Sequence, residues 1–193
     1  MIKSEILESI FVKQKLLENE KILSQIEYIA NKCLDSLMNG GKIILAGNGG
    51  SFADAQHISA EFTSKYMFER ESLPSLSLGC NNSAITAIGN DYGYDQVFAR
   101  ELASIADSKD IFIAISTSGN SENILQSIKV ANTKKITTFG FTGDIGGKMA
   151  ELCECIKIPS SVTGRIQECH IMIGHIICAI VEKKYFKESS NEI

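Results

Sequence analysis

The first 38 residues carry apolar side chains at roughly the spacing of one helical stripe. The sequence Asn39-Gly40-Gly41 then follows, and glycine suits the left-handed position after a helix end. The pattern predicts one helix over residues 2–38. The apolar positions that carry it are Ile6, Ile10, Leu17, Ile22, Ile26, Ile29, Cys33 and Leu37.

Five short apolar runs follow, with helical patterns between them. The third and fourth are nearly continuous in apolar or β-branched residues, as strands covered on both faces are. The predicted strands are 42–46, 73–78, 111–115, 136–141 and 155–158. The predicted helices are 51–66, 83–88 continuing into 96–105, 121–131, 148–152 and 165–184.

Strands that alternate with helices predict a parallel sheet with right-handed crossovers. We therefore expect a single α/β domain over residues 1–193, with a three-layer, doubly wound sheet of five parallel strands. The α/β core is expected over residues 42–185. The helical segment 1–38 is an addition to it, and its apolar residues on more than one face favour contacts within an oligomer.

Composition narrows the class of protein. Hydrophobic residues make up 44% of the 193 residues and charged residues 22%, as in an ordinary soluble domain. The net charge is −4 and no basic block occurs, so we expect no nucleic-acid partner. Apolar stretches are too short to span a membrane, and the start Met1–Glu5 lacks a secretory pattern. The expected location is cytoplasmic.

Two strand-to-helix loops have an unusual composition. The first is Gly47-Asn48-Gly49-Gly50-Ser51, where glycines let the backbone approach a ligand and the next helix start favours an anion. The second is Ser116-Thr117-Ser118-Gly119-Asn120-Ser121, whose four hydroxyls can surround a phosphate without Lys or Arg. Each loop can also be read as a simple turn, because Ser51 and Ser121 are good helix N-cap residues.

Neither loop matches a nucleotide-binding motif. Phe52 stands where the dinucleotide fingerprint has its third glycine, and no Gly-Lys-Ser/Thr follows either loop. The two loops therefore favour a small phosphorylated metabolite over NAD or ATP.

Two histidines are candidates for chemistry. His57 and Glu61 lie four residues apart on the helix after the glycine loop, so both side chains leave the same face and can share a metal or a substrate. A surface His–Glu pair is the alternative. His175 lies within an apolar helix, where it is either a core residue, a ligand or a proton-transfer group. His170 is interpreted as structural or exposed.

Seven motifs in this order resemble the phosphoheptose isomerases of the SIS (sugar isomerase) family, and the resemblance covers about residues 5 to 185. It implies a flavodoxin- or Rossmann-like SIS domain. The motifs are Gly47–Ser51, Asp54–His57, Glu61, Gly89–Asp91, Ser116–Ser121, Thr142–Gly147 and Arg165–Glu168.

The resemblance implies an aldose–ketose isomerase that converts sedoheptulose 7-phosphate to D-glycero-D-manno-heptose 7-phosphate. It also implies that the product feeds ADP- or GDP-heptose synthesis for lipopolysaccharide or capsule. Glu61 and His175 are the implied catalytic residues of an enediol mechanism. The implied substrate contacts are Asn48, Gly49, Gly50, Ser51, Glu61, Asn90, Asp91, Ser116, Thr117, Ser118, Ser121 and Gln167.

The resemblance also implies a homotetramer with active sites at subunit interfaces, and one zinc ion per subunit. The implied zinc ligands are His57, Glu61, Gln167 and His175. Gln167 and His175 are eight residues apart, about 12 Å on a straight helix, so one ion is reached by both only with extended side chains.

Two other functions remain open at the level of sequence. The DnaA initiator-associating protein, a non-catalytic binder of the same fold, resembles this chain almost as closely in its loops. A regulatory sensor of sugar phosphates is the third reading, and it needs a partner domain for which 193 residues leave no room.

Overall fold

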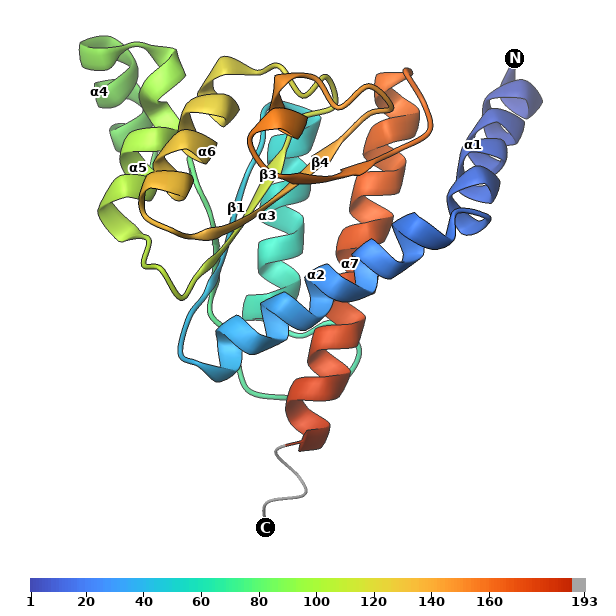
Figure 1. Cartoon of the computed structure of the whole chain (residues 1–193), viewed down its shortest axis with the longest axis horizontal. Helices are drawn as coiled ribbons and strands as arrows, with labels where there is room; N and C mark the ends of the chain where they lie inside the picture. Colours follow the sequence, from blue (N-terminus) through green and yellow to red (C-terminus); the bar gives the residue numbers. More distant parts are fainter. Residues whose placement is uncertain (189–193) are drawn as a thin grey trace.

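Five parallel strands form a sheet at the centre of the fold (Figure 1). The computed structural model describes residues 1–188, so residues 189–193 of the predicted domain lie outside the described part. All neighbouring strands pair in parallel, which confirms the predicted doubly wound sheet. The order is β2-β1-β3-β4-β5, with β1 Ile43–Ala46, β2 Ser75–Ser77, β3 Ile111–Ile115, β4 Thr137–Thr142 and β5 Glu154–Lys157.

Helices cover both faces of this sheet. Successive residues of β1 explain why, because Ile43 and Leu45 enter one core while Ile44 and Ala46 enter the other. The first core is covered by α2 (Glu20–Met38), α3 (Gly50–Thr63) and α7 (Thr163–Glu188). The second is covered by α4 (Asn82–Tyr92), α5 (Val97–Ile105) and α6 (Glu122–Thr133). Single 3-10 turns span Tyr94–Gln96 (η1) and Lys148–Glu151 (η2).

The N-terminal segment differs from the prediction, because it is two helices rather than one. Helix α1 spans Ile2–Leu17, and α2 begins at Glu20. The break arises at Asn19, whose side-chain oxygen accepts a hydrogen bond from the backbone N–H of Ile22 at 3.2 Å and so caps a new helix. Helix α1 extends away from the sheet and buries only Val12 and Leu16 (Figure 1).

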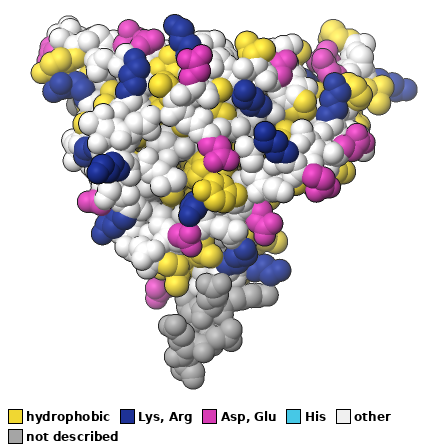
Figure 2. Space-filling view, in the orientation of Figure 1, with side chains coloured by type: hydrophobic (Ala, Val, Ile, Leu, Met, Phe, Trp, Pro, Cys, Tyr) yellow, Lys and Arg dark blue, Asp and Glu magenta, His cyan; other side chains and the backbone are white. Residues whose placement is uncertain are grey.

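The surface carries mixed charge. On the face shown in Figure 2, basic and acidic side chains are interspersed over the described residues, without a large area of one sign. Among helices of residues 1–188, none has the length and apolar character that crossing a bilayer requires.

The strand order determines where loops meet. After β1 the chain turns to β2 on one side of it, and then crosses to β3 on the other side. The loops that follow β1 and β3 therefore lie side by side at the carboxyl edge of the sheet, which is the switch point where such folds bind ligands.

Candidate active site

The glycine loop after β1 has a backbone that only glycine readily adopts. Gly49 has φ +55°, and a Cβ on Gly47 would lie 2.3 Å from the carbonyl oxygen of Ser51. Helix α3 then starts at Gly50, with Gly49 as N-cap and no side-chain capping hydrogen bond. Its first N–H groups are therefore oriented toward the switch point without a side-chain acceptor from the cap residue.

The serine loop after β3 also leads into a helix whose start has no side-chain cap. Ser121 is the N-cap residue of α6, yet its side chain makes no capping hydrogen bond. Ser116 Oγ instead donates to Ser121 Oγ at 3.1 Å. A reciprocal amide pair joins the glycine loop to the first turn of α6, in which Asn48 and Asn123 each donate to the other at 2.9 Å. The phenol of Tyr94 also donates to Asn48 Oδ1 at 3.2 Å, a contact that the sequence did not indicate.

A cavity of about 300 Å³ lies between these loops. Eight of the predicted substrate-binding residues line it, together with Ile115 and Thr163. The uncapped N-terminal ends of α3 and α6 both adjoin it, so partial positive charge and hydroxyl groups surround one space. The eight are Asn48, Gly49, Gly50, Ser51, Ser116, Thr117, Ser121 and Gln167.

Four predicted substrate contacts do not line this cavity within one chain. One of them, Glu61, belongs to the cluster described below. Ser118 is exposed, and its Oγ accepts a hydrogen bond from the backbone N–H of Asn120 at 3.2 Å. Asn90 and Asp91 lie exposed on α4, where the Asn90 amide donates to the Asp91 carboxylate at 2.8 Å. Their contact with substrate stays a prediction.

A second group of residues converges between α3 and α7. His57 Nε2 lies 3.0 Å from Glu61 Oε1 and 3.1 Å from His175 Nε2. The ligand atoms of all three lie within 4.8 Å of one another. The predicted common face of His57 and Glu61 is confirmed, and His175 faces this cluster rather than the core.

Two residues near the cluster were not among the predicted site residues. Asp54 precedes His57 by three residues on α3, and burial raises its pKa to about 6 although His57 acts to lower it. The spacing within the motif was a signal that Asp54 shares this face. The ring of Tyr66 stacks on His175, with centroids 5.4 Å apart and planes 21° apart. No sequence pattern indicated Tyr66, because it lies in an irregular segment after α3.

Gln167 lines the cavity between the two loops. Its amide packs against Gly50, where an added Cβ would meet Gln167 Nε2 at 2.4 Å. It therefore belongs to the cavity, and its role as a metal ligand stays a prediction. His170 is fully buried and its ring nitrogen Nε2 lies 3.3 Å from the carbonyl oxygen of Thr142, so it is structural.

The donor set of the cluster fits a zinc ion. Two imidazole nitrogens and one carboxylate oxygen are the ligand types that catalytic zinc sites use, with a fourth position left for water or substrate. The imidazole nitrogens of His57 and His175 face each other at 3.1 Å, as nitrogens that share an ion do. The cluster therefore has the residues, and the convergence, that such an ion requires.

Comparison with known proteins identifies the family. The chain matches the SIS domain family over residues 11–143. It is 54% identical over 187 residues to a phosphoheptose isomerase of Aneurinibacillus thermoaerophilus, an alignment that covers 96% of this chain and 94% of that protein. The chain belongs to the SIS family of phosphoheptose isomerases.

Two further members of the phosphoheptose isomerase family support this result. Phosphoheptose isomerase 2 of Campylobacter jejuni is 49% identical, with 96% of this chain and 92% of that protein covered. The solved structure of a phosphoheptose isomerase from Neisseria gonorrhoeae has a TM-score of 0.88 at 37% identity, and covers 94% of this chain and 97% of its own. The family that the seven motifs indicated is confirmed.

Proposed function

We propose that this chain isomerises sedoheptulose 7-phosphate to D-glycero-D-manno-heptose 7-phosphate. One observation carries the proposal: a cavity with anion-binding character and a His–Glu–His cluster occur together in a chain of this family. Relatives named phosphoheptose isomerase align over nearly its whole length, which supports the choice of substrate.

The cavity is suited to the terminal phosphate. Two helix N-termini without side-chain caps offer N–H groups, and Ser51, Ser116, Thr117 and Ser121 offer hydroxyls. A phosphate held by neutral donors keeps the reacting carbons of the sugar in place, so binding energy far from the reaction serves to orient it.

The reaction moves one proton between two carbons. Glu61 takes a proton from C1 of the ketose, which leaves an enediol, and then donates a proton to C2. His175 transfers a proton between the two oxygens, so that the hydroxyl at C1 becomes the aldehyde and the ketone at C2 becomes a hydroxyl. No proton or electron is gained or lost in the sum, as an intramolecular isomerisation requires.

His57, Glu61 and His175 are the residues that would hold a zinc ion, with Gln167 as the further ligand that the family resemblance implies. When bound, zinc supplies a Lewis acid that polarises the carbonyl oxygen. His57 serves chiefly to hold the cluster together, since its Nε2 lies within 3.1 Å of both partners.

A homotetramer with active sites at subunit interfaces is part of this proposal. Helix α1 exposes a row of apolar side chains, which includes Phe11 at 58% exposure. An apolar groove of about 440 Å³ lies between α1, α2 and α7, lined by residues such as Leu17, Met172 and Ile176. Surfaces of this kind in a soluble chain favour association with further copies.

The proposed setting is the cytoplasm, where the product would enter activated-heptose synthesis for lipopolysaccharide or capsule. An assay on sedoheptulose 7-phosphate, with and without a chelator, tests the function. Isomerisation in deuterium oxide should place deuterium at C2 of the product, since the proton carried by the Glu61 carboxyl group exchanges with solvent before it is donated to C2. A protein that binds sedoheptulose 7-phosphate in the presence of zinc but never converts it would instead be a non-catalytic binder.

A further inference from the structure

The side chains of Arg70 and Glu182 form an ion pair that is almost wholly buried. Their exposed fractions are 2% and 1%, and Arg70 Nε lies 2.9 Å from Glu182 Oε1. Arg70 belongs to the irregular segment between α3 and β2, whereas Glu182 lies on α7. Removing two charges from water is costly unless hydrogen bonds satisfy both groups, so their other partners indicate what the pair holds in place.

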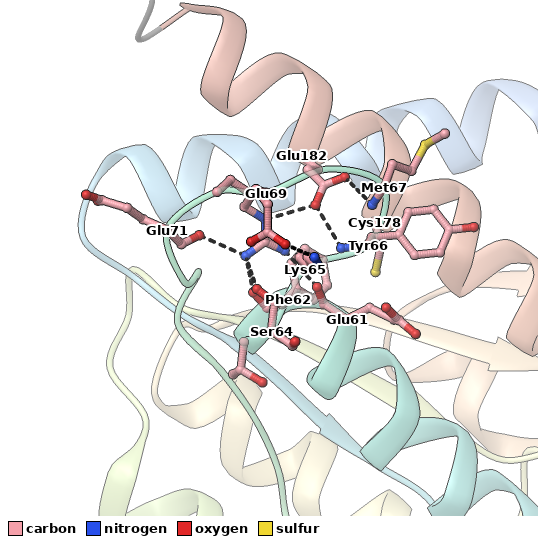
Figure 3. Close-up of polar contacts among 12 residues, drawn as sticks. Glu61, Phe62, Ser64, Lys65, Tyr66, Met67, Glu69, Glu71, Cys178 and Glu182 are labelled. Atoms are coloured by element: carbon pink, nitrogen blue, oxygen red, sulfur yellow. Dashed lines mark hydrogen bonds and ion pairs between the residues drawn. The ribbon is translucent and has the colours of Figure 1, made fainter.

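Glu182 holds the start of the segment that follows α3. Its two carboxylate oxygens accept hydrogen bonds from the backbone N–H groups of Tyr66 and Met67, each at 2.8 Å. Figure 3 shows Glu182 reaching down from α7 to these two nitrogens, with the end of α3 directly below them. The backbone at Tyr66 is thereby tied to α7.

Arg70 holds the end of α3 itself. Its guanidinium donates to the carbonyl oxygens of Glu61 and Phe62, each at 2.7 Å, and of Ser64 at 2.9 Å. These carbonyls belong to the last turn of α3 and the residue after it, where a helix leaves its carbonyls without intrahelical partners. Arg70 therefore fixes the turn of α3 that carries Glu61.

The same bonds reach His175 through a ring contact. Tyr66, whose backbone N–H is bound to Glu182, stacks its ring on the imidazole of His175. Glu182 follows His175 by seven residues, or about two turns, so both side chains leave the same face of α7. One buried pair thus contacts both elements that bring the cluster together.

We propose that the Arg70–Glu182 pair has a positioning role and holds the side chains of Glu61 and His175 within contact distance of His57. Arg70 fixes the α3 side and Glu182, through Tyr66, fixes the α7 side. The inference rests in part on the proposed function, because the geometry that it maintains is the one assigned to proton transfer. The same geometry should also determine the affinity of the cluster for zinc, and that affinity can be measured without any substrate.

Glu182→Gln is the first test variant, because the amide replaces one of the two oxygens that together accept from three donors by an N–H₂ group. Supporting contacts around metal ligands typically change affinity or activity by about 10- to 100-fold when lost. We expect losses of that size in zinc affinity, measured by competition with a chromogenic chelator, and in kcat. KM should change little, since the phosphate cavity is built by other residues.

Asp110→Asn provides a matched control. Asp110 is also 1% exposed and also accepts from three donors, namely Lys42 Nζ at 2.6 Å, the Lys42 N–H at 2.9 Å and the Asp107 N–H at 2.8 Å. It precedes β3 and so lies at the opposite edge of the sheet from the loops. It should lower the melting temperature as Glu182→Gln does, with zinc affinity and kcat unchanged.

Two milder variants apply if Glu182→Gln does not fold. Arg70→Lys keeps the charge but loses the planar fork that reaches the carbonyls of α3. Tyr66→Leu keeps the ion pair and removes only the ring on His175. Each should lower zinc affinity and kcat in the folded protein.

Losses in zinc affinity and kcat no larger than those of Asp110→Asn would overturn the positioning role and leave a purely structural pair. A wild-type protein without isomerase activity would instead refute the proposed function. In that case the zinc affinities still decide the positioning role on their own.

Discussion

Replacing Ser121 by alanine separates the two roles that a serine at the start of α6 can have. Its Oγ lies at the cavity and accepts from Ser116, without capping the helix. A lost hydrogen bond to a charged group costs about 1.5–3 kcal/mol, which corresponds to roughly 10- to 150-fold in KM for the sugar phosphate. A lost cap would instead cost about 1 kcal/mol of stability, or roughly 2–4 °C in a chain of this size.

Steady-state kinetics on sedoheptulose 7-phosphate and a thermal melt of the same preparation measure both quantities. We expect the KM of Ser121→Ala to rise at least tenfold while the melting temperature stays within about 1 °C. Ser104→Ala is a suitable control, because Ser104 is an exposed serine on α5 whose hydroxyl bonds only the backbone carbonyl of Glu101. An unchanged KM with a lowered melting temperature in Ser121→Ala would refute the assignment of this loop to phosphate.

Three further predictions concern the cluster, the core and the assembly. Glu61→Gln should lower kcat by about 10²- to 10⁴-fold with substrate binding retained, and turnover near the wild-type rate would exclude Glu61 as the base. Burial lowers the pKa of His170 from 6.5 to about 4, so the folded state resists a proton that the unfolded state accepts. The contribution of His170 to the free energy of unfolding should be fully present above pH 6.5 and should fall by about 3 kcal/mol toward pH 4. Chemical denaturation at several pH values measures this decline, which should be absent in His170→Asn. Deletion of residues 1–17 should abolish the tetramer in light scattering, and an intact tetramer would contradict the role of α1.

The architecture was predictable because its signals are local. Continuous apolar runs such as 111–115 and the helical patterns between them define a parallel sheet without knowledge of contacts. The break at Asn19 was missed because apolar residues continue at roughly helical spacing across it. The spacing of apolar residues carries no information about the Asn19 cap, because that cap consists of a single hydrogen bond from the Ile22 N–H.

The site was predictable only in part, since its parts come from distant stretches of chain. The i,i+4 spacing placed His57 and Glu61 on one face, and the strand–loop–helix pattern placed both loops at one edge. Tyr66 and the Arg70–Glu182 pair had no such signal. Arg70 and Glu182 are 112 residues apart in sequence, and only packing of α7 against α3 brings them together.

The reciprocal bond between Asn48 and Asn123 has a consequence for the folding equilibrium. It joins the glycine loop to the first turn of α6, 75 residues further along the chain, so the anion cavity exists only when β1 and β3 are already paired. A small anion that binds there selects the folded chain and must shift the unfolding equilibrium by mass action. At a hundred times its dissociation constant, such a ligand adds about 2.7 kcal/mol to the free energy of unfolding. Sugar-phosphate supply in the cell would then influence not only flux through the enzyme but also how much of it survives proteolysis.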